Sequence, residues 1–327
     1  MKKKRVLSGM RPTGPLHLGN LFGALANWVE MQATYDCFFF IADWHALTSD
    51  YEKPNHIKGF IREMMIDWLS VDLSPEKSTL FVQSQVKEHA ELYLLLSMIT
   101  PVPWLERNPT YKDQILQLSN KDLSTFGFLG YPVLQAADII MYKPAGVPVG
   151  VDQVPHVEIT REIARRFNFL YGDVFPEPEA LLTETPKILG TDRRKMSKSY
   201  NNAIYLSDGP DEIAAKVAQM ITDPQRARRS DPGDPDVCNV FSFHKMYTEP
   251  AAVADIERRC RSAGIGCVDC KKIMSANLIK ALEPIREKRH YYEDRPELVE
   301  EIMHTGSERA RDVARATMAE VRSAVKI

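Results

Sequence analysis

The stretch PTGPLHLGN, residues 12–20, follows the first short apolar run of the chain and opens its first amphipathic segment. The run at 6–8 predicts a buried strand, and the apolar residues of 19–33 recur at helical spacing. A second apolar run at 38–42 completes the sequence of a strand, a crossover helix and a parallel strand. The quoted stretch therefore lies where a strand turns into a helix, and it predicts a parallel α/β fold.

The same alternation continues up to about residue 200. It predicts strands at 80–82 and 147–149 and helices at 57–71, 88–98, 131–142 and 157–169. The segment 101–120 has prolines and polar residues without a clear period, so we expect a long loop there. Beyond residue 206 the pattern predicts only helices, at 211–221, 253–263, 270–290 and 297–326. We expect an α/β domain over residues 1–203 and an all-helical domain over residues 204–327.

Composition and charge narrow the class of protein. The 327 residues are 44% hydrophobic and 26% charged, with a formal net charge of −2, which is typical of a globular protein and excludes collagen-like and disordered chains. No apolar run approaches the roughly 18 residues that cross a bilayer. The basic start at 1–5 is not followed by the apolar segment of a signal peptide, so we expect a cytoplasmic protein without membrane association. The near-neutral charge leaves room for local basic patches only.

Two segments carry residues suited to phosphate chemistry. In the first, residues 12–20, a glycine lets a ligand approach the backbone, and the start of the helix presents unpaired N–H groups to an anion. His17 and Asn20 add side-chain donors three residues apart. Taken alone, this stretch is equally well explained as a turn with an incidental histidine.

The second segment is KMSKS, residues 195–199, which follows Arg193 and Arg194. We expect a mobile loop whose two lysines close on a polyphosphate and neutralise its charge. A solvated basic loop is the simpler explanation for these five residues alone. The presence of both motifs in one α/β chain is hard to attribute to chance.

Together the two motifs resemble the HIGH-type turn and the KMSKS loop of class I aminoacyl-tRNA synthetases. A closer likeness is to the tryptophanyl-tRNA synthetases, whose first motif commonly ends in Gly-Asn, as it does at 19–20. The stretches YPVLQAADI at 131–139 and VPVGVDQVPHVEITRE at 147–162 resemble their amino-acid-binding helix and their adenosine-binding strand, turn and helix. The resemblance extends over nearly the whole chain. It implies a Rossmann-like catalytic domain over 1–203 and a helical tRNA anticodon-binding domain over 204–327.

The resemblance also implies a reaction and its partners. L-tryptophan would attack Mg-ATP to form tryptophanyl-adenylate and pyrophosphate, and the aminoacyl group would then pass to the 3′-terminal adenosine of tRNA(Trp). The enzyme would be a homodimer, with the tRNA spanning both subunits. Catalysis would come from aligning the reactants and stabilising phosphate charge, because little covalent chemistry falls to side chains. The residues in this role are His17, Asn20, Lys195 and Lys198.

Further site residues follow from the resemblance. The ATP-binding residues are Arg11, Pro12, Thr13, Gly19, Asn20, Gly150, Val151, Asp152, Ile188, Leu189, Lys195, Met196, Ser197, Lys198 and Ser199. The tryptophan-binding residues are Leu7, His45, Tyr131, Gln135, Asp138, Val147, Val149 and Gln153. Arg11 stands where many bacterial tryptophanyl enzymes have glutamine, and Gln135 where some have methionine. Lys112 lies in a segment only loosely similar to their mobile substrate loop and is a weaker candidate for an ATP contact.

Asp138 carries the argument about specificity. It lies one turn beyond Leu134 on a mostly apolar helix, so its carboxylate is expected to accept a hydrogen bond from a buried donor, which in this family is the indole N–H. An aspartate on the helix surface is the alternative. Tyrosyl enzymes also place a carboxylate near their phenol, so a tyrosyl-tRNA synthetase is the second candidate, although the Pro-Val-Gly at 148–150 favours tryptophan. A non-catalytic RNA-binding paralogue is a third candidate, against which the two intact motifs weigh.

Four of the five cysteines cluster in the last third of the chain. Cys238, Cys260, Cys267 and Cys270 are separated by 21, 6 and 2 residues, and four thiolates suit either zinc or a [4Fe-4S] cluster. The spacing resembles a subset of bacterial tryptophanyl-tRNA synthetases that carry a [4Fe-4S] cluster, so iron is preferred to zinc, with unliganded cysteines third. The expected role is structural. Basic residues that would contact tRNA phosphates flank this region: Arg226, Arg228, Arg229, Lys271 and Lys272.

Overall fold

The structure, a computed structural model, describes residues 3–117, 122–182 and 188–327. The chain forms two compact units. The first, here called the α/β unit, comprises Met1–Gly14, Asn27–Thr185 and Arg295–Ile327. The second, the helical unit, comprises Pro15–Ala26 and Pro186–Asp294. Each unit is therefore built from separate stretches of the chain.

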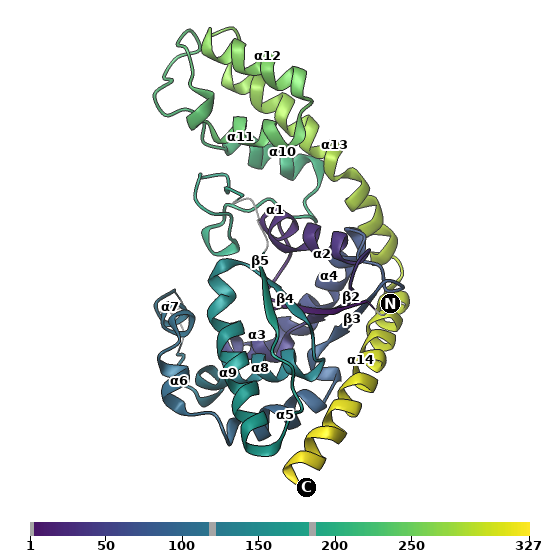
Figure 1. The fold of residues 1–327 in the computed structure, drawn as a ribbon. Helices are drawn as coiled ribbons and strands as arrows, with labels where there is room; N and C mark the ends of the chain where they lie inside the picture. Colours follow the sequence, from purple (N-terminus) through teal and green to yellow (C-terminus); the bar gives the residue numbers. More distant parts are fainter. Residues whose placement is uncertain (1–2, 118–121, 183–187) are drawn as a thin grey trace. The chain divides into compact units, whose positions relative to one another are not determined.

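A parallel sheet forms the centre of the α/β unit (Figure 1). Its strands in the described residues are β1 (Arg5–Met10), β2 (Asp36–Ile41), β3 (Ser78–Val82), β4 (Gly146–Val149) and β5 (Glu179–Leu182). They lie in the order β3-β2-β1-β4-β5 and pair in parallel throughout. The direction of the strand order reverses between β1 and β4, and ligands of open α/β sheets bind at the carboxyl ends of strands at such a point.

Helices cover both faces of this sheet (Figure 1). Those of the α/β unit are α2 (Ala26–Met31), α3 (Asp43–Asp50), α4 (Ile57–Ser70), α5 (Glu88–Ser97), α6 (Val102–Glu106), α7 (Pro109–Gln117), α8 (Phe126–Met141), α9 (Val154–Tyr171) and α14 (Pro296–Val325). Successive residues of β2 point to opposite faces, as the pleat requires. Phe39 stacks on Trp28 of α2 at 4.5 Å between ring centroids. Phe38 and Phe40 instead join the core cluster that contains α5, α8 and α9.

The helical unit is organised by its longest helix, α13 (Cys267–Glu293). The helices α10 (Pro210–Gln219) and α11 (Asn239–Tyr247) pack on α13, and α12 (Pro250–Arg261) packs on α11. This unit also contains the short α1 (Leu18–Asn20), which continues into a π-helical turn at Leu21–Leu25. Among the described residues, no helix combines the length and apolar character needed to span a membrane.

The strands predicted at 6–8, 38–42, 80–82 and 147–149 are confirmed by β1 to β4. The long loop expected at 101–120 is wrong for its described part, where the chain forms α6 and α7, while 118–120 lies outside the described residues. The strand β5 was not predicted, because it is a four-residue edge strand without a buried side chain. The domain division at residues 203 and 204 remains a prediction. The compact units differ from it in grouping 186–203 with the helical unit and α14 with the α/β unit.

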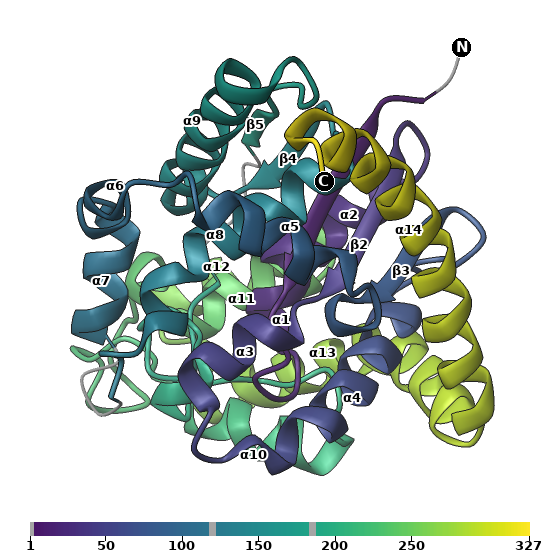
Figure 2. The same ribbon diagram turned by 90° about the horizontal axis from the view of Figure 1, so that it is seen from below.

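The helix α14 covers the edge of the sheet along β3, as Figures 1 and 2 show. An uncovered edge strand offers unpaired backbone groups to other chains. Here the backbone N–H of Val82 donates to Ser307 Oγ at 3.4 Å, and Arg309 Nη2 donates to the carbonyl of Pro75 at 2.7 Å. The close approach depends on Gly306, because a Cβ at this position would overlap the carbonyl oxygen of Leu80.

We therefore expect Gly306→Ala to lower the free energy of unfolding by about 1 to 3 kcal/mol or more, since the helix must move away from β3. The matched control is Gly59→Ala in α4, where an added Cβ meets nothing within 4 Å. Alanine favours the helix there, so this variant should be as stable as the parent or up to about 1 kcal/mol more stable. Denaturant unfolding of the full chain measures both. Equal stability of the two variants would contradict the close contact.

Candidate active site

The turn after β1 forms the amino end of α1 in the helical unit. His17 is the N-cap residue of α1, and its backbone N–H donates to Asn20 Oδ1 at 3.0 Å. The His17 side chain is buried, and its Nδ1 has no hydrogen-bond partner among the described residues. Burial, together with the positive charges of Lys198 and Lys195, lowers the pKa of His17 to about 4. The imidazole is therefore neutral at pH 7, so it can donate one N–H to an anionic oxygen.

The chain after the KMSKS segment pairs with this turn. The backbone N–H of Leu18 donates to the carbonyl of Ile204 at 3.0 Å, and that of Leu206 donates to Leu16 at 2.9 Å. The rings of His17 and Tyr205 lie 6.4 Å apart between centroids. The structure thus brings the two predicted motifs together within one unit, although they are far apart in the sequence.

The KMSKS segment itself forms one arm of a hairpin. Backbone hydrogen bonds join Gly190 to Arg194 at 2.7 Å and Met196 to Ile188 at 3.0 Å. The Lys195 side chain is exposed, while Met196 is buried and would lie in van der Waals contact with a Cβ at Gly19. The segment expected to be a mobile loop therefore has defined backbone pairing.

Asn202 holds this hairpin from inside. Its Nδ2 donates to Asp192 Oδ1 at 2.7 Å and to the carbonyl of Lys195 at 3.2 Å, and its Oδ1 accepts from the backbone N–H of Ser197 at 2.8 Å. The residue is almost fully buried. We did not predict a role for Asn202, because an asparagine in a polar, basic stretch has no pattern that distinguishes it from its neighbour Asn201.

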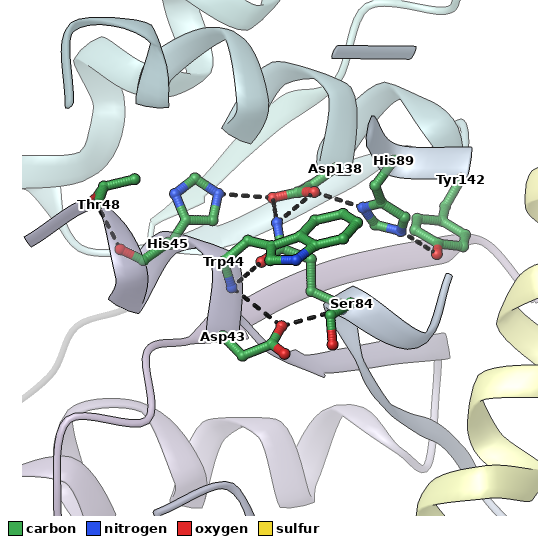
Figure 3. Close-up of polar contacts among 9 residues, drawn as sticks. Asp43, Trp44, His45, Thr48, Ser84, His89, Asp138 and Tyr142 are labelled. Atoms are coloured by element: carbon green, nitrogen blue, oxygen red, sulfur yellow. Dashed lines mark hydrogen bonds and ion pairs between the residues drawn. The ribbon is translucent and has the colours of Figure 1, made fainter. Parts of the chain in front are cut away.

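The α/β unit contains a candidate site of its own, the buried carboxylate of Asp138 (Figure 3). Its donors come from three other elements, and these are His45 of α3, Gln83 of the short helix Gln83–Gln85 after β3, and His89 of α5. The distances to the carboxylate oxygens are 2.8 Å from His45 Nε2, 2.8 Å from Gln83 Nε2 to each oxygen, and 2.5 Å from His89 Nδ1. The predicted acceptor thus lies in the interior and not on the helix surface.

The charge of Asp138 depends on these contacts. Burial alone would raise the pKa of the Asp138 carboxyl, but the hydrogen bonds and charges of His45 and His89 hold it below its ordinary value. Asp138 is therefore ionised at neutral pH. A buried carboxylate in this state can only accept hydrogen bonds, so it selects for a ligand that donates one.

The other predicted tryptophan-binding residues also belong to the α/β unit. Leu7 and Val147 lie in the core cluster with α8, and Val149 packs against that cluster. Gln135 is partly buried on α8, and Gln153 donates to Asp152 at 3.0 Å. Tyr131 is buried, and its hydroxyl lies 3.2 Å from Nε2 of His156, a residue we did not predict. Burial lowers the pKa of His156 to about 4, so this histidine is also neutral at pH 7.

The predicted ATP-binding residues are divided between the two units. The α/β unit contains Arg11, Pro12, Thr13, Gly150, Val151 and Asp152, while the helical unit contains Gly19, Asn20, Ile188, Leu189, Lys195, Met196, Ser197, Lys198 and Ser199. Arg11 and Thr13 are exposed, as are Val151 and Asp152. Lys112 is exposed on α7.

The four clustered cysteines all belong to the helical unit. Cys238 is the N-cap residue of α11, Cys260 lies in α12, and Cys267 and Cys270 form the first turn of α13. Burial, together with the nearby thiols of the other three, raises the pKa of Cys270 to about 12. The cysteines therefore gather in one region, although no group of three or more His, Cys, Asp or Glu side chains in the described part of the chain is arranged to hold a metal ion.

Two nitrogen donors approach this group of thiols. Arg226 Nη1 lies 3.9 Å from Cys260 Sγ and 3.8 Å from Cys267 Sγ, and His244 Nε2 lies 3.3 Å from Cys270 Sγ. Arg226 Nη2 also donates to the carbonyls of Arg229 and Ile265, both at 2.9 Å. Arg226, predicted as a tRNA contact, is thus engaged inside the unit.

The α/β unit has a parallel sheet whose strand order reverses beside β1. The helical unit has an HLGN turn at a helix N-terminus, and the chain that follows the KMSKS hairpin pairs with this turn. These features define a class I tRNA synthetase. The chain belongs to the family of class I tRNA synthetases for tryptophan and tyrosine (W and Y), which it matches over residues 1–283. It is 52% identical to the tryptophan–tRNA ligase of Thermotoga maritima over 99% of each chain. It is 48% identical to that of Aquifex aeolicus, covering 99% of this chain and 100% of the relative.

The comparison with solved structures agrees with the sequence relatives. The crystal structure of tryptophanyl-tRNA synthetase from Campylobacter jejuni complexed with ADP and tryptophan matches with a TM-score of 0.92 and 34% identity, covering 99% of this chain and 100% of that one. Tyrosyl-tRNA synthetase from Archaeoglobus fulgidus matches with a TM-score of 0.66 at 19% identity, a level that shows a shared fold alone.

Because Asn202 holds the KMSKS hairpin, we expect Asn202→Ala to lower the rate of amino-acid activation by about 10- to 100-fold through misplacement of the lysines. The measurement is ATP–pyrophosphate exchange at saturating substrates. The control is Asn201→Gly, since Asn201 is exposed and has a φ of 50°, which glycine adopts freely. If both variants lost activity equally, the contacts of Asn202 would not explain the effect.

Proposed function

We infer that the chain is a tryptophan–tRNA ligase. It activates L-tryptophan with Mg-ATP to give tryptophanyl-adenylate and pyrophosphate, and it then transfers tryptophan to the 3′-terminal adenosine of tRNA(Trp). The observation that carries this conclusion is the similarity to tryptophan–tRNA ligases over 99% of the chain, including the residues of both motifs.

In this proposal the helical unit supplies the groups that act on ATP. Neutral His17 donates an N–H to a phosphate oxygen. Asn20 stabilises the turn, because its side-chain oxygen accepts the backbone N–H of His17. Lys195 and Lys198, whose charges both face His17, neutralise the negative charge that develops on the leaving pyrophosphate. Mg²⁺ binds through the phosphates of ATP and withdraws charge from them. No side chain forms a covalent intermediate.

The α/β unit supplies the specificity for tryptophan. The ionised Asp138 accepts the indole N–H, so an amino acid without a donor at that position leaves the carboxylate without its ligand hydrogen bond. A phenol could also donate to Asp138, which keeps a tyrosyl enzyme as the second candidate. The identity of the relatives favours tryptophan. Intact catalytic motifs weigh against a non-catalytic RNA-binding protein.

We further propose a cytoplasmic homodimer that binds tRNA across both subunits. Large apolar side chains are exposed on the end of α5 and the start of α6, namely Leu94, Met98 and Val102, which are 54%, 69% and 50% exposed. A contact between copies of the chain would remove this apolar surface from water.

Arg228, Arg229 and Lys272 are exposed and suited to tRNA phosphates, while Lys271 donates to the carbonyl of Ala218 at 2.7 Å.

The function is tested by ATP–pyrophosphate exchange with tryptophan and, in parallel, with tyrosine. We expect exchange with tryptophan alone. Lys195→Ala should slow adenylate formation by a factor of about 100 or more while tryptophan binding changes little, because the charge it removes acts on the transition state. Exchange with tyrosine alone would show that Asp138 accepts a phenol. The absence of exchange with both amino acids would favour the RNA-binding alternative.

We also propose that Cys238, Cys260, Cys267 and Cys270 hold a [4Fe-4S] cluster with a structural role, and zinc is the alternative. Four cysteine thiols are the donor set that such a cluster takes, and they gather in one region, where burial and neighbouring thiols raise the pKa of Cys238, Cys260 and Cys270. Arg226 and His244 would then donate to the ligand sulfurs. When bound, the cluster would cross-link α11, α12 and α13 and supply no step of the reaction.

This proposal predicts a brown protein after anaerobic purification, with about four iron and four sulfide per chain. Absorbance near 400 nm, iron and sulfide content and zinc content are measured on the same sample. Cys260→Ser should lose the iron and lower the stability of the helical unit, whereas Cys37→Ser, which lies in β2 of the other unit, should retain it. A colourless sample with one zinc per chain would select the alternative, and a metal-free sample would exclude both.

A further inference from the structure

The groups around Asp138 differ in their access to solvent. Asp138, Gln83 and His89 have no exposed surface, and neither does Tyr142, which lies behind His89. The side chain of His45 is 10% exposed. Among the described donors to Asp138, His45 is thus the one with any exposed surface, while His89 and Tyr142 lie in the interior behind the carboxylate (Figure 3).

The hydrogen bonds that Gln83 and His89 make to the carboxylate have defined directions. Gln83 Oε1 accepts from the backbone N–H of Trp44 at 3.1 Å, so its Nε2 must be the atom that donates to Asp138. His89 Nδ1 lies 2.5 Å from the carboxylate, which can only accept, so Nδ1 carries a hydrogen. The other ring nitrogen of His89 lies 2.6 Å from the hydroxyl of Tyr142. The Tyr142 hydroxyl therefore holds the ring of His89 from the side opposite the carboxylate.

Tyr142 is suited to this task. Burial raises the pKa of the Tyr142 hydroxyl well above its ordinary value, so the hydroxyl keeps its proton at all physiological pH values. It comes one turn after Asp138 at the end of α8, so the acceptor and the last donor of the chain of hydrogen bonds belong to the same rigid segment. Asp138 and Tyr142 thus contact the two ring nitrogens of His89 from the same segment of the chain.

We propose that His89, held in place by Tyr142, is a positioning residue for amino-acid selection that keeps Asp138 oriented to accept the N–H of an indole. The proposal rests on the proposed function as a tryptophan–tRNA ligase. His89 does not contact the substrate and acts through Asp138. Without its hydrogen bond the carboxylate can rotate away from the ligand, and the lost selectivity concerns only substrates that carry the N–H.

A purely structural role for the same two rings makes a different prediction. His89 and Tyr142 also pack with Phe81, at 6.2 and 5.4 Å between centroids, in the core of the α/β unit. If packing were their only task, their replacement would weaken activation of every amino acid to the same degree. The discriminating measurement is therefore a comparison of two substrates of equal shape, one of which lacks the N–H.

The test uses the full chain and ATP–pyrophosphate exchange with L-tryptophan and with its benzothiophene analogue, in which sulfur replaces the indole N–H. The variants are Tyr142→Phe and His89→Leu, which remove the hydroxyl and the Nδ1 donor, and His89→Asn, whose amide can restore a donor at Nδ1. Tyr93→Phe, in α5 and without a contact to Asp138, controls for the loss of a partly buried hydroxyl.

We expect Tyr142→Phe and His89→Leu to raise KM for tryptophan at least tenfold, with less than threefold change in kcat and in KM for ATP. Their KM for the benzothiophene analogue should change less than threefold. His89→Asn should recover most of the tryptophan affinity, and Tyr93→Phe should match the parent.

Three outcomes would overturn the proposal. Parallel losses for both substrates would assign the pair to packing, and unchanged KM for tryptophan in Tyr142→Phe would show that the Tyr142 hydroxyl does not position His89. Tyr142→Phe removes a single atom and keeps the ring, so it remains decisive if His89→Leu does not fold. A parent enzyme inactive with tryptophan would overturn the proposed function itself, which separates that failure from the other two.

Discussion

An ionised carboxylate with no access to water is the constraint around which the α/β unit is arranged. A buried charge is strongly destabilising unless donors surround it, and Asp138 receives donors from α3, from the short helix after β3 and from α5. These elements begin at the carboxyl ends of β2 and β3 or shortly after them. The hydrogen bonds to this one side chain therefore connect the elements at the edge of the sheet where α/β proteins bind their ligands.

The phosphate-binding chemistry is arranged on a different principle. In the helical unit the charged groups stay near solvent, and backbone pairing with buried amides sets their position. Asn202 makes three hydrogen bonds to the hairpin. The backbone of Leu16 and Leu18 pairs with the segment that follows the hairpin. Lys195 is exposed, while the neutral His17 is the group that burial has altered. The carboxylate in the α/β unit is desolvated, whereas the lysine-containing segment of the helical unit is accessible to solvent.

The strands and motifs that depend on short stretches of sequence were predicted from those stretches. The apolar runs located β1 to β4, and the spacing of HLGN and KMSKS located both motifs. Asp138 was predicted as a buried acceptor from its place on an apolar helix. Its partners were not predicted as a set, because Gln83 and His89 lie 55 and 49 residues away in sequence and neither belongs to a motif. The helices α6 and α7 were missed because prolines and polar residues hide their period, and β5 because an exposed edge strand has no apolar run.

The path of the chain has a consequence for how the protein is made. The helix α14 leaves the ribosome after the helical unit, yet it belongs to the unit that contains β1. Until those residues emerge, the backbone groups of β3 that bond to Ser307 and Arg309 lack these partners. A nascent chain must therefore complete the entire helical unit while the sheet is still open along one side. Ribosome stalling or a late frameshift would release a product with every catalytic motif intact and an edge ready to pair with other chains.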